Sequence, residues 1–488
     1  MAGLQHSFIF SAIDRLGNIT INLVTMATVA RLLTPDEVGV FVVGAAVALV
    51  IQTLRDTGAA IYLIQEPDVT REGVRTTFTI MCVINLFLAI ALYLSAAPVA
   101  TFYSEQRLRP ILQIMSVGVL IACFANVPVA LMRRDLEFGH IATVNLLGSL
   151  VNLVVVIILI LSGFSYLSLP WATVASLSAM TIATICLRPI PWMYRFDLSE
   201  WRRVLEFSSY SSIAAILVNA LTMLPQFIIG RMIGFDAVGI FSRAVIVCQL
   251  PDRSVLSAFM PVVLPAFAAR VRDGADLKPT YLQSLSLTSV IYLPIMLCIA
   301  LLAHPVVEAL LGDQWTRAVP LVRILCVASL CLFPVSLNFP VLVAKGRIRD
   351  TVTMMLILLP VTALIVFVAA FYGLTIVALT AFITAPAQAG LSFWFVRRQV
   401  PFKWNEIVGS IRESITVMIC AGVAPMLIVV ALGSRPGLTA AAIAAVGATI
   451  GWFLGVWATG HPLLSYLTDT AHMLLSQLTG RAANTSGK

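Results

Sequence analysis

The sequence predicts an all-α integral membrane protein with about 14 transmembrane helices. Of the 488 residues, 60% are hydrophobic and only 11% are charged, and the mean hydropathy is +0.98. Soluble domains carry roughly 25% charged residues. The apolar residues also fall in continuous blocks that are long enough to cross about 30 Å of hydrocarbon as helices. Barrel strands would instead alternate in polarity over about ten residues.

The apolar blocks give the positions of the predicted helices. Along the first half of the chain they lie at about 9–30, 38–64, 76–97, 111–132, 141–162, 166–187 and 207–230. Along the second half they lie at about 238–262, 283–303, 318–343, 351–372, 374–396, 414–433 and 438–458. Asp14 and Arg15 interrupt the first block and no basic segment precedes it, so we expect the first helix to be retained rather than cleaved as a signal.

Lysine and arginine positions predict the orientation. With the N-terminus inside, the inner loops would hold 20 of these residues and the outer loops 6, and the other five of the 31 lie within spans. Because basic residues gather in cytoplasmic loops, both termini are predicted to be cytoplasmic. The formal charge of +8 follows from this bias and requires no nucleic-acid partner.

An internal repeat predicts the architecture. The segment Arg31–Phe41 recurs 200 residues later as Arg231–Phe241, with arginine, aspartate, valine, glycine and phenylalanine at equivalent positions. A second, shorter repeat relates Asn126-Val-Pro to Asn338-Phe-Pro. Because the repeat unit holds six helices, an even number, both copies should insert in the same orientation as a parallel repeat. Substrates of such proteins bind between the two lobes, near the middle of the membrane.

The predicted domains are two six-helix lobes and three smaller segments. They are an N-terminal lobe at 1–190, a cytoplasmic amphipathic connector at 191–206, a C-terminal lobe at 207–400, two extra C-terminal helices at 401–460 and a cytoplasmic tail at 461–488. Trp192, Tyr194 and Trp201 suit the connector to the level of the lipid headgroups.

Charged residues within the apolar blocks are the main candidates for a substrate site. They are the arginines Arg15, Arg55, Arg243, Arg253 and Arg323 and the aspartates Asp14, Asp56 and Asp252. A charge at bilayer depth costs at least about 2.5 to 3.5 kcal/mol, so these residues predict a water-filled cavity or a shared polar interior. The arginines outnumber the aspartates by two. Each Arg-Asp pair has two interpretations, a substrate site or a structural lock on a broken helix, and a coupling role for the aspartates is also open.

Two predicted helices carry polar stripes. Asn18 and Asn22 share a helix face with Arg15, and Asn219 and Gln226 are seven residues apart in the seventh block. Such amide groups suit the hydroxyls of sugars in a wet groove. They equally suit hydrogen bonds between helices, which are common in membrane bundles.

Cysteine and histidine positions give no sign of a metal or catalytic site. All eight cysteines fall within apolar spans and lack the short spacings of a zinc site. The five histidines are scattered, and neither a nucleophile with its base nor a phosphate-binding glycine loop is found. We therefore expect no enzymatic activity, no metal and no cofactor.

Two segments carry short family-like signatures. The N-terminal one consists of Arg31, Leu33, Pro35, Gly39 and Phe41, followed by Leu54-Arg-Asp-Thr-Gly58. The one at the start of the second lobe consists of Gly234, Gly239, Phe241, Ser242 and Ala244. With these residues the chain resembles the bacterial oligosaccharide flippases of the multidrug/oligosaccharidyl-lipid/polysaccharide exporter superfamily, and the resemblance covers about residues 8–400.

The resemblance implies a flippase that moves polyprenyl-diphosphate-linked oligosaccharide repeat units across the bacterial inner membrane, for exopolysaccharide, capsule or O-antigen synthesis. Transport would proceed by alternating access through an arginine-lined central cavity, because guanidinium groups bind phosphate oxygens in pairs. The implied partners are this substrate, the lipid bilayer, and the polysaccharide polymerase and export machinery. The alternative is a multidrug or cation exporter of the same fold, which would use unpaired intramembrane acids. The sequence leaves the sugar and the driving force open.

Overall fold

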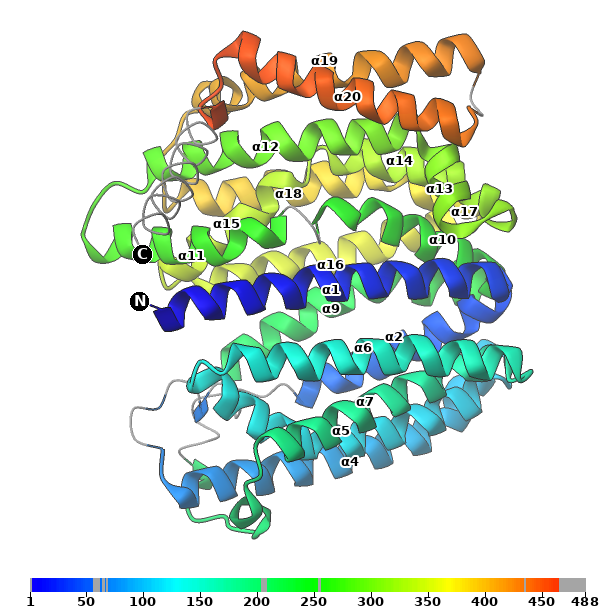
Figure 1. Cartoon of the computed structure of the whole chain (residues 1–488), viewed down its shortest axis with the longest axis vertical. Helices are drawn as coiled ribbons and strands as arrows, with labels where there is room; N and C mark the ends of the chain where they lie inside the picture. Colours follow the sequence, from blue (N-terminus) through cyan, green and yellow to red (C-terminus); the bar gives the residue numbers. More distant parts are fainter. Residues whose placement is uncertain are drawn as a thin grey trace, which may run out of the picture. The chain divides into compact units, whose positions relative to one another are not determined.

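The computed structural model describes residues 2–55, 62–63, 66, 69–202, 209–252, 256–433 and 436–464. Within these ranges, the side chains of 2–13, 55, 209–215, 257–258, 261–262 and 348 lie outside the description. Every regular element in the described part of the chain is a helix (Figure 1). Ten of these helices are long and apolar enough to cross a membrane, or eleven if one bent pair counts as a span. The chain is thus a multi-pass membrane protein, while the number fourteen stays a prediction.

In its described residues, the first sequence copy forms six α-helices. They are α1 (Ala2–Leu32), α2 (Pro35–Arg55), α4 (Arg71–Tyr103), α5 (Leu108–Arg134), α6 (Phe138–Leu161) and α7 (Ser168–Leu187), the last preceded by the short η1 (Ser165–Leu167). Helix α5 packs against α4 and α7, and α6 packs against α1 and α7 (Figure 1). Thr70 caps the start of α4, because its hydroxyl accepts a hydrogen bond from the Gly73 amide at 2.8 Å.

The second copy follows the same order with more breaks. Its helices are α9 (Ser209–Met232), α10 (Phe235–Cys248), α11 (Ser257–Arg272), α12 (Lys278–Leu301), α13 (Ala303–Leu311), α14 (Val319–Ser329), α15 (Phe333–Ala344), α16 (Ile348–Ala370), α17 (Leu374–Leu379) and α18 (Ala381–Arg397), with η4 (Asp313–Ala318) before α14. The span predicted at 318–343 is two helices bent by 47°. The bend falls just before Pro334, which lies in the first turn of α15, where a helix tolerates a residue without a backbone N–H.

Two further helices, α19 (Trp404–Leu432) and α20 (Leu438–Thr459), follow the repeat and pack against each other and against α12. Hydrogen bonds between buried polar side chains connect α12 to α19 and to the residue that follows α20. Ser289 Oγ donates to Ser414 Oγ at 2.8 Å, and His461, just beyond α20, lies 2.8 Å from Ser286 Oγ through Nε2. Because His461 Nδ1 accepts from the Leu463 amide, Nε2 carries the proton and donates to Ser286.

The chain divides into two compact units. Unit 1 comprises Met1–Ala244, Leu310–Ala318 and Ile348–Thr380, and unit 2 comprises Val245–Ala309, Val319–Arg347 and Ala381–Lys488. Unit 1 therefore includes α9 and α16 of the second copy, and α9 packs there against α2 and α16. The lobe boundaries predicted from the repeat stay predictions.

Within unit 1, the repeated segments contact each other where α2 and α10 begin. A Cβ atom on Gly39 would lie 1.8 Å from the carbonyl oxygen of Phe235, and one on Gly239 would lie 1.9 Å from that of Pro35. These contacts are reciprocal, because both glycines and both carbonyls occupy equivalent positions of the repeat. Only glycine allows two backbones to approach this closely. We call this contact the glycine crossing.

Each copy makes an ion pair of its own beside the glycine crossing. Arg107 Nη1 lies 2.7 Å from Asp36 Oδ2, and Arg317 Nη1 lies 2.7 Å from Asp236 Oδ2. Arg107 also binds Glu105 at 2.7 Å, and this hydrogen bond holds the pKa of the Glu105 carboxyl below its usual range. Arg107 follows α4 and Arg317 lies in η4, and both belong to loops predicted to lie outside. Partly exposed pairs of this kind contribute about 0 to 1 kcal/mol each, so they fix geometry more than stability.

The described part of the connector packs onto the start of α4. Met193, in η2 (Pro191–Tyr194), is fully buried, and Arg75 Nε donates to the Trp192 carbonyl at 3.0 Å. Glu200 accepts a hydrogen bond from Thr70 Oγ1 at 2.8 Å. Three large apolar side chains beyond η2 stay exposed: Phe196, Leu198 and Trp201. The connector is therefore attached to the first copy on one side and presents apolar groups on the other.

Candidate functional site

The predicted site residues are distributed over several helices. Asp14, Arg15, Asn18 and Asn22 lie on α1, Asn219 and Gln226 on α9, Arg243 on α10 and Arg323 on α14, and Asp252 follows the end of α10. Arg55 is the last residue of α2, but its side chain lies outside the description. Asp56 and Arg253 fall outside the described residues altogether.

A polar cluster joins α1 to α6 in unit 1. Both carboxylate oxygens of Asp14 accept amide hydrogen bonds, one from Asn18 Nδ2 at 2.6 Å and one from Asn145 Nδ2 at 3.2 Å. Ser149 Oγ donates to Asn18 Oδ1. Among the described side chains, no ion pair joins Asp14 to Arg15. Asp14 is thus stabilised by amide hydrogen bonds from two helices, and its structural or coupling role stays a prediction.

The polar stripe on α9 makes one contact to α2. Asn219 Nδ2 donates to the buried Thr53 Oγ1 at 3.0 Å. Gln226 is half-buried on the same helix. Asn22 on α1 is exposed, and its amide donates to the Asn18 backbone carbonyl at 2.7 Å. Asn219 therefore connects α9 to α2. The side chains of Asn22 and Gln226 are at least partly accessible.

Asp252 lies beside α12 in unit 2. Its carboxyl is hydrogen-bonded with the hydroxyl of Tyr292, a side chain that is 2% exposed. Cys248 and Cys326 lie nearby, with their sulfur atoms 3.1 Å apart. Arg323, also in unit 2, is half-buried on α14.

Arg243 is the most buried of the described candidates. Its side chain is 8% exposed, and Nε has no hydrogen-bond partner. The guanidinium carbon lies 5.6 Å from the centre of the Trp315 ring, a cation–π contact. No described carboxylate pairs with it. Such a guanidinium retains its capacity to bind an anion, because phosphate oxygens accept from the same N–H groups that remain unused here.

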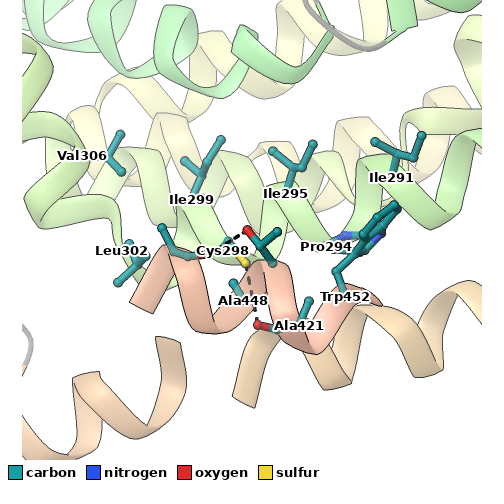
Figure 2. A pocket seen from close by; sticks show the side chains of 12 residues that line it. Ile291, Pro294, Ile295, Cys298, Ile299, Leu302, Val306, Ala421, Ala448 and Trp452 are labelled. Atoms are coloured by element: carbon teal, nitrogen blue, oxygen red, sulfur yellow. Dashed lines mark hydrogen bonds between the residues drawn. The ribbon is translucent and has the colours of Figure 1, made fainter. Parts of the chain in front are cut away.

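An apolar groove lies between α12, α19 and α20 in unit 2. It has a volume of about 450 Å³, and eleven of its twelve lining residues are apolar. Figure 2 shows Ile291, Ile295 and Ile299 spaced along α12, with Ala448 and Trp452 on the facing α20. The groove has the size of sites that bind small apolar ligands. The two helices that follow the repeat, α19 and α20, form one side of the groove.

Sequence reasoning missed five residues that contact the predicted site residues: Thr53, Asn145, Ser149, Tyr292 and Trp315. A signal existed for two of them, because Asn145 and Ser149 are four residues apart in an apolar span and so share a helix face. Tyr292 and Trp315 gave no signal, since aromatic residues in or near a span are most often packing or interfacial residues.

Comparison with protein families gives one match over much of the chain. The model of a family described as polysaccharide biosynthesis protein matches residues 28–320. The succinoglycan biosynthesis transport protein ExoT of Rhizobium meliloti is 27% identical over 343 residues, which cover 69% of this chain and 68% of that protein. The lipopolysaccharide biosynthesis protein WzxC of Escherichia coli is 22% identical, over 70% of this chain and 69% of that protein.

Solved structures with a similar fold are membrane transporters. The lipid II flippase MurJ in an inward closed conformation superposes with a TM-score of 0.75 at 12% identity, over 94% of this chain and 100% of that chain. A multidrug resistance MATE family transporter in an inward-facing conformation gives 0.66 at 16% identity, over 81% of this chain and 98% of that chain. At these identities the likeness establishes the fold alone.

Proposed function

This chain belongs to the family of polysaccharide biosynthesis proteins, and from that premise we propose that it is a flippase for polyprenyl-diphosphate-linked oligosaccharide units. The substrate would turn from the cytoplasmic to the outer leaflet of a bacterial inner membrane by alternating access. The observation that carries the proposal is the buried Arg243 guanidinium, which no described carboxylate neutralises. A relative named for succinoglycan transport supports the same substrate class.

The charge balance of the spans favours an anionic cargo. The apolar blocks contain five arginines and three aspartates, and the substrate's diphosphate carries about two negative charges. Moving two negative charges outward is favoured by about 2.3 kcal/mol per charge per 100 mV of an inside-negative potential. The membrane potential alone would then bias transport outward. A cation or drug exporter of the same fold is not favoured, because its cavity would need the opposite sign.

The function is tested by measuring which leaflet holds the substrate. In vesicles reconstituted with the full chain, a labelled lipid-linked oligosaccharide should become accessible to an impermeant oxidant faster than in protein-free vesicles. Arg15→Gln and Arg323→Gln should each slow this rate about tenfold, the loss expected when a charged contact of about 1.4 kcal/mol or more is removed. Arg133→Gln, an exposed arginine at the end of α5, is the matched control and should transport normally. An unchanged leaflet distribution would reject the proposal, and drug resistance that follows the protein would favour the exporter.

The lipid chain of the substrate would pack in the apolar groove of unit 2. Its lining offers almost only carbon atoms, so an isoprenoid chain can pass from the bilayer into the groove without losing an apolar environment, and packing contacts hold it there. Ala448→Phe fills the groove and should lower the transport rate about tenfold, the effect of about 1.4 kcal/mol. Ala442→Phe, an exposed position on α20 outside the groove lining, should transport normally. Equal transport by both variants would remove the groove from the mechanism.

A further inference from the structure

Side chains of η4 attach to the end of α1 in unit 1. Trp315 Nε1 donates to the Ala30 carbonyl at 2.6 Å, and Gln314 Nε2 donates to the Leu33 carbonyl at 3.2 Å. The last carbonyls of a helix have no partner within the helix, so these two donors cap α1 from outside. Trp315 is fully buried in this position. We call the contact of Gln314 and Trp315 with the end of α1 the Trp315 latch.

The Trp315 latch covers the Arg243 guanidinium. Arg243 is 8% exposed under the ring, with Nε unpartnered, and no described carboxylate offsets its charge. The contact with the ring at 5.6 Å recovers part of the lost hydration, but a cation–π contact replaces none of the hydrogen bonds that water gave the N–H groups. The latched arrangement therefore holds a charge whose desolvation is incompletely compensated. Release of Trp315 would return that charge to water.

The charge is present in one copy alone. The position equivalent to Arg243 in the first copy is Val43, which is fully buried. The first copy also makes a contact reciprocal to the latch, in which Tyr103 hydroxyl donates to the Phe227 carbonyl at 3.3 Å near the end of α9. Arg231 lies near the Tyr103 contact, 5.4 Å from the centre of the Phe102 ring, but it is exposed. Of these two contacts between described residues, the one made by Trp315 is therefore the one that covers a buried arginine. The architecture of the repeat does not require a charge here, so Arg243 serves another purpose.

We propose that the Trp315 latch closes the predicted outer end of the transport path, and that Arg243 beneath it is an anion site that becomes available when the latch opens. The uncompensated charge favours opening, and a diphosphate group binds to the exposed guanidinium and holds the latch open. The identity of the ligand rests on the proposed function, whereas the latch and its dependence on Arg243 do not. Arg243 is thus assigned to the outward-facing state, as the residue that receives the substrate before release.

The latch is tested by the accessibility of a cysteine at position 33, a buried position whose backbone carbonyl accepts the hydrogen bond from Gln314. Leu33, which is 2% exposed, is replaced by cysteine, and the Leu33→Cys chain is placed in nanodiscs. Alkylation by a polar maleimide is then quantified on the peptide that contains position 33. The native cysteines can therefore stay in place. Adding Arg243→Met keeps the length of the side chain without the charge and should slow the labelling at position 33 about tenfold, since the latched state no longer buries a charge. Adding Trp315→Phe removes the hydrogen bond to Ala30 and should accelerate the labelling. Arg109→Met, at an exposed arginine in a predicted outer loop, is the matched control and should leave the labelling unchanged.

Inorganic diphosphate tests the anion site without any lipid-linked substrate. It should accelerate the labelling at position 33 in the chain with Arg243 and leave the Arg243→Met chain unaffected, while sulfate at equal ionic strength has a smaller effect. Labelling that is equal with and without Arg243 would overturn the latch. Equal acceleration by diphosphate in both chains would overturn the anion site. Neither labelling measurement involves transport. If the vesicle assay described above failed, the assignment of the ligand would fall with it. The two labelling results would still decide the latch and the anion site.

Discussion

Replacing Gly39 or Gly239 with alanine is expected to destabilise the protein by at least about 3 kcal/mol, the upper range for overpacking. The new Cβ would lie 1.8 Å or 1.9 Å from a backbone carbonyl oxygen, and real Cβ contacts below 3.0 Å essentially never occur. The obstructing atoms belong to the backbone, so no side-chain rotation relieves the overlap. The helices α2 and α10 must part by more than about 1 Å.

The measurement is the thermal unfolding temperature of each purified variant. Gly390→Ala and Gly409→Ala are matched controls, because both glycines lie in helices and a Cβ on either meets nothing within 4 Å. These controls should be neutral or more stable by about 0.5 to 1 kcal/mol, the usual gain of alanine over glycine in a helix. The double variant at the crossing should cost less than the sum of the single ones, because one separation of the helices relieves both overlaps. Unfolding temperatures that match those of the controls would show that the crossing is looser than described.

Replacing Asn338 with alanine is expected to cost about 3 kcal/mol, since it breaks two buried hydrogen bonds and leaves a hydroxyl unpaired. Tyr281 Oη donates to Asn338 Oδ1 at 2.5 Å, and Asn338 Nδ2 donates to Ser392 Oγ at 2.7 Å. All three side chains are at most 1% exposed. Water therefore cannot replace the lost amide without entering a packed region of unit 2.

The repeat supplies the control for this second prediction. Asn126 occupies the equivalent place in the first copy, but it is half-buried and makes no side-chain hydrogen bond with the described residues. Asn126→Ala should therefore change the free energy of unfolding by less than about 0.5 kcal/mol. A variant that restores one donor, Asn338→Gln, should recover part of the loss if the network is responsible. Equal costs at 126 and 338 would show that the loss comes from the helix break near the shared proline rather than from the network.

The positions of the helices were largely predictable because hydropathy alone sets them. The block predicted at 438–458 is α20, Leu438–Thr459, and the block predicted at 351–372 is α16, Ile348–Ala370. Breaks inside spans were not predictable in the same way. The bend between α14 and α15 depends on how Pro334 and the turn before it pack, and a mean over an apolar block does not contain that information.

The candidate site was likewise predictable in its charged residues but not in their contacts. The sequence indicated Asp14 and Arg243 as costly intramembrane charges, because composition reveals them. It did not reveal that Asp14 is held by Asn145, which is 131 positions away in the chain, or that Trp315 of η4 covers Arg243. Which helix lies beside which is a property of tertiary packing. In the same way, the repeat showed that Gly39 and Gly239 are equivalent, but equivalence does not imply contact.

The reciprocal form of the glycine crossing has a consequence for how the two halves relate. Residue 39 meets residue 235 while residue 239 meets residue 35, which is the pattern that two identical subunits make about a two-fold axis. A single six-helix half bearing this segment would thus present a surface complementary to a second copy of itself. Joining the halves in one polypeptide keeps that self-complementary contact and frees each half to differ elsewhere, as Val43 and its counterpart Arg243 already do.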